Sequence, residues 1–370
     1  MLRETVPSGS DEPLGSLRVM MVIESDYPSV DGGGAEAQVE TLTRNRPDGV
    51  EVMVVAPLVP FGPQAVHDVV HGCPVQRIPY PTLPLIGGLI MLCRLALLIA
   101  RKRREIDAVH CHIAHNMAAV ACFVGWLLSL PVLVKLTGMT ELENGILSDR
   151  ASPALALKRW LIKHATAVQA VSEELEAGLL AKGFDPARVH RLPNAVDTRL
   201  FAPADRTAVR VRLGIEAGFI ACFVGRLVPE KALDSLIRAW AKAIPADASA
   251  ALVLVGTGHL EDELKVLAAE LGRSSQIRFE GFVADKAVIA DYWRISDVGL
   301  LTSEFEGLSN ALLEAMSAGV PMIGSRVSGN TDLILPGKTG WLFQPRDIDQ
   351  LKACLAEAFL MAPETRLALG

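Results

Sequence analysis

The chain has 370 residues, of which 50% are apolar and 21% are charged, and its formal net charge is −6. This length and apolar content suffice for two buried cores of ordinary domain size. The acidic balance argues against a nucleic-acid-binding protein, which would need a basic surface. The six cysteines are scattered without a C-x-x-C pair, which favours reduced thiols and a cytoplasmic location.

Residues 1–16 are polar and lack the apolar core of a secretory signal, so they are predicted to form a disordered tail. From Leu17 onward, apolar runs with strand character alternate with helical segments. The first set of predicted strands covers 17–23, 50–56, 75–78, 108–113, 132–136, 167–171 and 189–192. Such alternation is typical of a doubly wound parallel sheet, and it predicts a Rossmann-like N-terminal domain over residues 17–200.

Three glycines, Gly32, Gly33 and Gly34, follow the first predicted strand and open a predicted helix. Without a Cβ atom, the backbone there can approach a ligand closely. The triplet alone is weak support for a binding site, and it does not complete the G-x-G-x-x-G fingerprint of dinucleotide-binding proteins.

Two apolar segments of the first domain raise the question of a membrane. The run 117–134 is uncharged but is split by Pro131, so a buried helix followed by a central strand explains it better than a membrane span. The run 85–100 ends in the basic cluster Arg101-Lys102-Arg103-Arg104. The segment 85–104 is therefore either a core-packed helix with a solvated basic end or a peripheral contact with an anionic membrane.

His110, His112 and His115 resemble metal ligands in their spacing, but no further ligand lies near them in sequence. A satisfied histidine at a strand end is the preferred interpretation. Asp347-Ile348-Asp349 similarly mimics a metal-binding D-x-D motif, yet helix capping explains it better. We therefore expect no metal site.

The alternation restarts after a polar stretch, with predicted strands at 219–224, 251–255, 277–280, 298–301, 321–324 and 341–343. These strands predict a second Rossmann-like domain over residues 201–370, with the boundary near 198–204. Two such sheets imply a crevice, and ligands are expected outside the carboxyl ends of the strands.

A cationic motif follows the first strand of the second domain. Gly225 is followed directly by Arg226, and Lys231 comes five residues later. A forked guanidinium and an ammonium at the end of a strand are suited to neutralise a diphosphate.

The most informative stretch is 303–319, which places Glu306 in a loop and Glu314 in the second turn of a helix that Ser309 is expected to cap. Asn310 and Glu314 share one helix face and lean toward the helix N-terminus. Free N–H groups at that terminus suit a phosphate, and Glu314 suits the two hydroxyls of a ribose.

This Glu-x7-Glu pattern, with Gly307, Leu308, Ser309 and Asn310 behind the first glutamate, resembles the retaining nucleotide-sugar glycosyltransferases of the GT-B fold, glycosyltransferase family four. The resemblance extends from Leu17 over nearly the whole chain. It implies that the second domain binds the nucleotide-sugar donor and that the first binds a sugar, polysaccharide or lipid-linked acceptor. It also implies a metal-independent reaction without a cofactor.

The resemblance assigns roles to individual residues. Arg226 and Lys231 would bind the diphosphate, Glu314 the ribose, and Glu306 the sugar hydroxyls together with the oxocarbenium-like transition state. Gly33 and Gly34 would face the diphosphate. The backbone near Phe282 and Val283 would read the base.

Two departures from the family leave alternatives open. No histidine follows the strand 132–136, so Thr137 or the Gly138 backbone would have to contact the sugar. The C-terminal helix that crosses back onto the first domain is expected to be incomplete. A GT-B sugar-nucleotide epimerase and a non-catalytic nucleotide-binding protein are therefore retained as alternatives to a transferase in polysaccharide or glycolipid synthesis.

Overall fold

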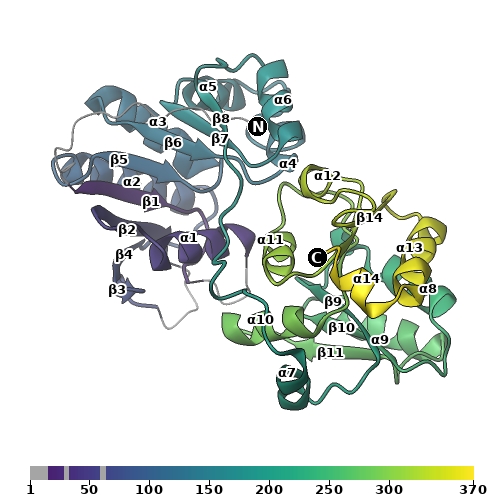
Figure 1. The fold of residues 1–370 in the computed structure, drawn as a ribbon. Coiled ribbons are helices and arrows are strands. Elements are labelled where there is room, and N and C mark those ends of the chain that lie inside the picture. Colours follow the sequence, from purple (N-terminus) through teal and green to yellow (C-terminus); the bar gives the residue numbers. More distant parts are fainter. Residues whose placement is uncertain (1–15, 29–32, 59–63) are drawn as a thin grey trace, which may run out of the picture.

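The computed structural model describes residues 16–28, 33–58 and 64–370, and it divides into two α/β lobes (Figure 1). In the described part, the first lobe contains an eight-stranded sheet of order β3-β4-β2-β1-β5-β6-β7-β8. The second contains a six-stranded sheet of order β11-β10-β9-β12-β13-β14. The predicted fold class, two Rossmann-like parallel-sheet domains that face a cleft, is confirmed.

Each predicted strand is present to within two residues. The strands are β1 (Leu17–Val22), β2 (Val50–Pro57), β3 (His67–Val70), β4 (Cys73–Ile78), β5 (Ala108–Cys111), β6 (Val132–Lys135), β7 (Ala167–Ala170), β8 (Val189–Arg191), β9 (Phe219–Val224), β10 (Ala250–Val255), β11 (Ile277–Gly281), β12 (Val298–Leu301), β13 (Met322–Ser325) and β14 (Gly340–Phe343). Only β3 was not predicted. It pairs antiparallel with β4 through the turn His71-Gly72, where both residues have positive φ.

Helices cover both faces of each sheet. They are α1 (Gly34–Arg44), α2 (Ile86–Lys102), α3 (Asn116–Leu128), α4 (Thr140–Glu143), α5 (Pro153–Lys163), α6 (Glu173–Ala181), α7 (Arg206–Leu213), α8 (Leu233–Ala243), α9 (Glu261–Glu270), α10 (Lys286–Ile295), α11 (Asn310–Ser317), α12 (Asn330–Leu333), α13 (Ile348–Leu360) and α14 (Pro363–Leu367), with a 3₁₀ turn at Pro229–Lys231. Both α13 and α14 lie in the second lobe (Figure 1).

The central strands are apolar on both faces because helices cover both sides of the sheet. In the second lobe β10 and β12 are buried at every position, and Trp240 of α8 packs on Phe219 of β9 with the ring centroids 6.2 Å apart. The run 117–134 forms α3 and β6, so the predicted helix and strand are both present. However, α3 is buried on its inner side only, because Phe123, Trp126 and Leu127 are exposed.

No helix in the described part of the chain is long and apolar enough to cross a membrane.

Candidate functional site

A cleft of about 390 Å³ lies between the carboxyl ends of the two sheets. Its first-domain wall comes from the N-terminus of α1 and the loop after β6. Its second-domain wall comes from the loops after β9 and β12 and from the start of α11. The cleft brings together most of the residues predicted from the sequence, namely Gly33, Gly34, Gly225, Arg226, Lys231, Glu306, Gly307, Leu308, Ser309, Asn310 and Glu314.

Phe282 and Val283 lie outside this cleft and line an adjoining cavity of about 530 Å³. Gly225, Arg226 and Lys286 line both cavities, so the two are continuous. A diphosphate at Arg226 would therefore sit between the two spaces. The arrangement leaves room for one part of a ligand beside Glu306 and for another beside Phe282.

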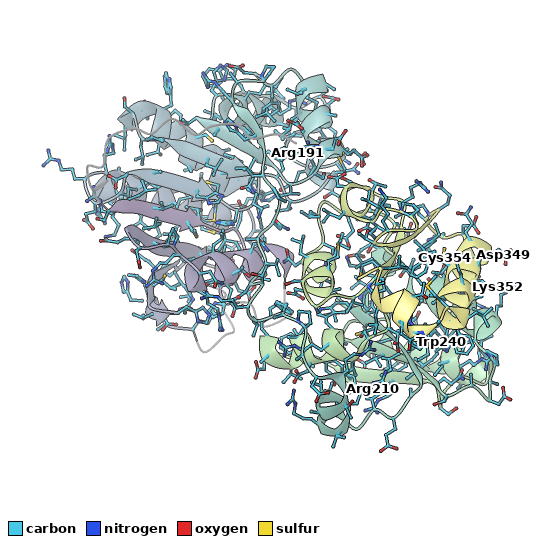
Figure 2. All side chains as sticks on the ribbon, viewed as in Figure 1. Arg191, Arg210, Trp240, Asp349, Lys352 and Cys354 are labelled. Atoms are coloured by element: carbon cyan, nitrogen blue, oxygen red, sulfur yellow. The ribbon has the colours of Figure 1, made fainter. Side chains whose placement is uncertain are left out.

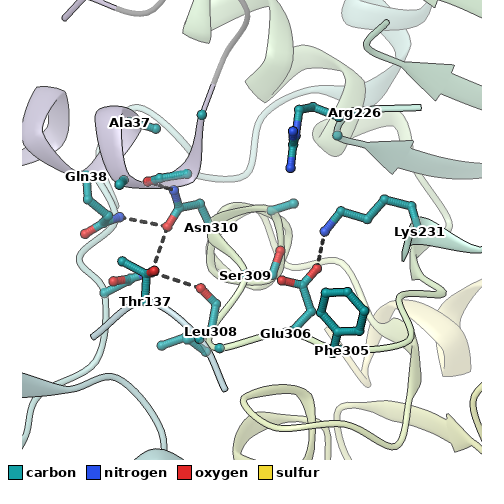
Figure 3. Close-up of a pocket in the computed structure, with 18 of the residues that line it drawn as sticks. Ala37, Gln38, Thr137, Arg226, Lys231, Phe305, Glu306, Leu308, Ser309 and Asn310 are labelled. Atoms are coloured by element: carbon teal, nitrogen blue, oxygen red, sulfur yellow. Dashed lines mark hydrogen bonds and ion pairs between the residues drawn. The ribbon is translucent and has the colours of Figure 1, made fainter. Parts of the chain in front are cut away.

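Lys231 and Glu306 form an ion pair at the second-domain wall (Figure 3). The Ser303 hydroxyl donates a second hydrogen bond to the same Glu306 oxygen at 2.8 Å. The side chains of Lys231 and Glu306 are only 18% and 14% exposed, so the ion pair is shielded from bulk solvent. The backbone carbonyl of Lys231 accepts a 2.6 Å hydrogen bond from the Thr302 hydroxyl, which joins the β9 loop to the β12 loop.

Arg226 extends from the end of β9 into the cleft (Figure 3). Its guanidinium is 57% exposed and contacts only Glu230, at 3.3 Å, among the described residues. The loop beneath it is tightly packed, because a Cβ atom on Gly256 would lie 2.0 Å from the carbonyl oxygen of Gly225. The guanidinium therefore lies over the cleft, and its N–H groups that do not contact Glu230 are available to bind an anion.

Glu314 is only 7% exposed on α11. Lys286, the first residue of α10, forms a 2.9 Å ion pair with its Oε1 atom, and Trp293 Nε1 lies 3.5 Å from Oε2. Lys286 was not predicted from the sequence. In the sequence, Lys286 comes directly after Asp285, whose side chain caps α10 by accepting from the Ala287 N–H. A capping residue marks where a helix starts, so this aspartate could have indicated that Lys286 begins a helix.

Asn310 joins the two domains rather than standing free in the cleft. Its Nδ2 donates to the Gly34 carbonyl at 2.9 Å, and its Oδ1 accepts from Gln38 at 2.9 Å and from Asn194 at 3.0 Å. Asn194 also donates to the Leu308 carbonyl at 2.9 Å. Gln38 and Asn194 were not predicted from the sequence, because no motif around either residue indicates that it contacts Asn310.

The helix start at Gly33 and Gly34 is as predicted, with Gly33 at the N-cap of α1. Gly32, the first member of the triplet, lies outside the described residues. Ser309 occupies the N-cap position of α11, but its hydroxyl makes no capping hydrogen bond, so that expectation was wrong. Ser309 lines the cleft instead.

Gly307 lies at a close approach of the two domains. A Cβ atom there would lie 1.8 Å from the Thr137 carbonyl oxygen, so only glycine allows the two backbones to meet. Thr137 and Gly138, the residues expected to replace the missing histidine, therefore stand directly opposite the loop that carries Glu306.

Polar side chains also line the first-domain wall, where the sequence indicated little. Lys135, at the end of β6, is 2% exposed and lines the cleft. Burial lowers the pKa of its ammonium to about 8, an effect that Glu141 partly offsets. In the described chain, no side chain forms a hydrogen bond or ion pair with this ammonium.

Glu141 accepts hydrogen bonds from the backbone N–H groups of Thr137, Gly138 and Ala114, at 2.6, 3.2 and 3.0 Å. It thereby holds the loop after β6 in place. Burial nevertheless raises the pKa of this carboxyl group to about 7, so desolvation outweighs the three hydrogen bonds.

The rings of His110 and His112 lie against each other, with centroids 4.1 Å apart and planes tilted by 35°. Burial lowers the pKa of His110 to about 4 and holds that of His112 well below its ordinary value. Neither ring nitrogen of His112 has a hydrogen-bond partner in the described structure, so the expected satisfied histidine is not found at this position. The described residues also contain no group of three or more His, Cys, Asp or Glu placed to hold a metal ion.

Asp347 caps α13 by accepting from the Gln350 N–H at 2.9 Å, which confirms the capping interpretation of the D-x-D motif.

Comparison with known proteins agrees with this geometry. Residues 32–195 match the glycosyl transferase 4-like domain, and residues 205–370 match the glycosyl transferases group 1 domain. The chain is 28% identical to a D-inositol 3-phosphate glycosyltransferase of Geodermatophilus obscurus, over 93% of this chain and 83% of that protein. It is 29% identical to a GDP-mannose-dependent alpha-mannosyltransferase of Mycobacterium tuberculosis, over 88% and 83%.

Among solved structures, Anabaena HepE in complex with UDP superposes with a TM-score of 0.76 at 20% identity, covering 95% of this chain and 92% of that one. This likeness concerns the fold. Together, the two matched domains and the relatives show that the chain is a glycosyltransferase that belongs to the glycosyl transferases group 1 family, with the GT-B fold.

Proposed function

We propose that the protein transfers a sugar from a nucleotide-diphosphate donor to an acceptor hydroxyl with retention of anomeric configuration. One observation carries the proposal. The second-domain wall presents two shielded carboxylates, Glu306 and Glu314, each paired with a lysine, beside the largely exposed side chain of Arg226, which contacts Glu230. Anionic and hydroxyl-rich parts of one ligand would find complementary groups there.

In this proposal Arg226 and Lys231 bind the diphosphate, which carries about two negative charges in a poorly hydrated site. Lys231 would then be shared between Glu306 and a phosphate oxygen. Glu314 would accept hydrogen bonds from the ribose hydroxyls, and Lys286 would hold that carboxylate in position. The base would occupy the adjoining cavity beside Phe282 and Val283.

The names of similar proteins support a nucleoside diphosphate as the leaving group. One relative is named for its dependence on GDP-mannose, and one similar structure holds UDP. They differ in base and sugar, so the proposal extends to the nucleotide class and to no particular donor.

The proposed reaction breaks the bond between the anomeric carbon and the diphosphate oxygen and forms a bond from that carbon to the acceptor oxygen on the same face. The acceptor proton passes to the leaving phosphate, so no side chain is needed as a base. Arg226 and Lys231 stabilise the charge that develops on the leaving group, and Glu306 stabilises the positive charge on the sugar ring. Contact between the domains at Gly307 and Thr137 would keep water from hydrolysing the donor.

These cations can supply the charge neutralisation that a metal ion provides in other transferases, so we propose that no metal cofactor is needed. Turnover should be unchanged when EDTA replaces Mg²⁺ in the assay. A loss of activity with EDTA that Mg²⁺ restores would contradict this part of the proposal.

The acceptor would lie on the first-domain wall, near Thr137, Gly138 and Lys135. We propose a lipid-linked or polysaccharide acceptor and action in a reducing, cytoplasmic compartment. Helices α2, α3 and α5 of the first domain are apolar and contain no acidic residues, which supports the lipid-linked form.

The experiment is a donor and acceptor screen with the product identified by NMR, run on the parent and on Glu306→Gln. A glycoside with the donor's anomeric configuration, formed by the parent and at least about 100-fold more slowly by the variant, supports the proposal. Inversion would contradict the retaining mechanism. A new donor isomer without any glycoside would favour the epimerase, and nucleotide binding without turnover would favour a non-catalytic protein.

A further inference from the structure

Three neighbouring helices of the first domain form an apolar surface without acidic residues. Helix α3 packs between α2 and α5 (Figure 1). These helices have 17, 13 and 11 residues and contain no Asp or Glu, although the whole chain has 42 acidic residues. They contain six basic residues, which are Arg94, Arg101, Lys102, Lys158, Arg159 and Lys163.

The outer side of this surface carries large apolar side chains. Trp126 and Leu127 of α3 are 64% and 57% exposed, and Leu157 and Trp160 of α5 are 59% and 46% exposed. Helix α2 adds Leu89 at 63%, and Leu85 precedes it at 93%. Isolated apolar residues on a surface are ordinary, but a group that spans three adjacent helices marks an interaction site.

Unpaired cations border the apolar residues. Arg101 and Arg104, at the end of α2, are exposed and form no side-chain hydrogen bond or ion pair in the described structure. Arg103 donates to the carbonyl groups of Leu128 and Ser129 at 2.9 and 3.2 Å, which joins the basic end of α2 to the end of α3 beside Trp126. Apolar and cationic groups thus occur together at this end of the surface.

The other helices of the first domain carry acidic residues. Helix α6 carries Glu173, Glu174 and Glu176 in its first turn, α1 carries Glu36 and Glu40, and α4 is also acidic. Within the first domain, the absence of acidic residues is therefore confined to α2, α3 and α5, and in the second domain it recurs in the short helix α7. In the first domain it is a local feature of one surface, since the chain as a whole is acidic.

We infer that α2, α3 and α5 together form a docking surface for an anionic lipid bilayer. Exposed Trp and Leu side chains enter the interfacial layer, and the cations are attracted to anionic headgroups. The surface goes beyond the segment 85–104, because α3 and α5 contribute both tryptophans. Leu85 follows β4 and so lies at the carboxyl edge of the sheet, the edge that borders the cleft, which would bring a lipid-linked acceptor close to the site.

Vesicle sedimentation combined with tryptophan fluorescence tests this inference. The probes are vesicles of phosphatidylcholine alone and of three parts phosphatidylcholine to one part phosphatidylglycerol. Trp240, labelled in Figure 2, lies in the second domain and is buried, as are Trp293 and Trp341, so an emission shift reports Trp126 and Trp160. We expect binding and a blue shift with the anionic vesicles only, both weakened by salt.

The double variant Trp126→Ser/Trp160→Ser should lose the shift and at least about tenfold in partition. Arg101→Glu/Arg104→Glu should lose binding by a similar factor. Val211→Ser, at a 79% exposed position of α7 in the second domain, is the matched control and should bind like the parent.

No sedimentation of the parent, or equal binding by parent and variants, would overturn the inference. So would a dimer in analytical ultracentrifugation that the tryptophan variant dissociates, because a second copy would then cover the surface. Sugar transfer to a water-soluble acceptor needs no bilayer, so failure here leaves the proposed function standing.

Discussion

Lys231 and Glu306 form an ion pair at the second-domain wall of the cleft, and the Ser303 hydroxyl donates to the same carboxylate oxygen. The pair holds the lysine where the loops after β9 and β12 converge. Replacement of the lysine by methionine would remove a cation proposed to bind the diphosphate and leave the carboxylate with a single neutral partner.

We therefore expect Lys231→Met to lower kcat/KM by about 100-fold or more, because an interaction with the leaving group is lost in the transition state. Steady-state kinetics with a saturating acceptor measures this. Lys242→Met is the matched control, since that lysine is 55% exposed and forms a 3.5 Å ion pair with an exposed aspartate. Equal activity of the Lys231→Met and Lys242→Met variants would show that Lys231 has no role in the site.

Lys286→Met tests the cation that the sequence did not indicate. Glu314 would then be a shielded carboxylate without its ion-pair partner, and we expect nucleoside diphosphate affinity to fall about tenfold or more. Isothermal titration calorimetry measures the change. Lys265→Met, at an exposed pair on α9, should leave affinity unchanged; a loss of the same size there would show that the effect is not local.

Gly307 lies where the backbones of the two domains meet. Gly307→Ala places a Cβ atom against the Thr137 carbonyl, so the loop must move away and the domain contact must open. We expect a large loss of activity and a larger radius of gyration in solution scattering. Gly88→Ala is the control, because nothing lies within 4 Å of the new methyl group, and alanine in a helix should stabilise it by up to about 1 kcal/mol. A fully active Gly307→Ala enzyme would contradict the close approach.

Glu141 makes stability depend on pH. Its pKa is raised from 4.5 to about 7 in the folded protein, so between these values the folded state binds more protons than the unfolded state. The contribution of Glu141 to the free energy of unfolding should therefore fall as pH rises through this window, by on the order of 3 kcal/mol. His110 and His112, whose pKa values burial lowers, contribute in the opposite direction, so the Glu141 contribution is the difference between the parent and a variant without this carboxyl group. Urea unfolding between pH 4.5 and 7.5 measures the slope.

Glu141→Gln should shift the slope toward greater stability at higher pH, because the amide does not titrate and the contribution of Glu141 is lost. Glu143→Gln, an exposed position on the same short helix, should retain it. Parallel slopes for the parent and Glu141→Gln would show that another group is responsible.

The fold was largely predictable from the sequence, because each central strand is a short apolar run bounded by polar turns. The strand β3 was missed because its burial pattern is that of an exposed edge, and it depends on its partner β4 for pairing. In the site, Glu306, Glu314, Arg226 and Lys231 stand out because their chemistry is local to one motif.

The remaining residues depend on tertiary structure. Gln38, Asn194 and Asn310 are scattered along the chain and acquire meaning only when the two domains come together. Lys135 and Lys286 look like ordinary surface cations in the sequence, and only folding buries Lys135 in the cleft wall and places Lys286 on Glu314. Ser309 stands at the N-cap position that the sequence rule predicts, yet its hydroxyl makes no capping hydrogen bond.

The central claim is that this cleft binds a nucleoside diphosphate through Glu314 and its neighbours. A thermal-shift titration with UDP, GDP, ADP, dTDP and NAD, on the parent and on Glu314→Ala, tests it most directly. One nucleoside diphosphate at 100 times its dissociation constant should stabilise the parent by about 2.7 kcal/mol, and the variant should lose that effect. Stabilisation by NAD alone, or an equal shift in both proteins, would contradict the account.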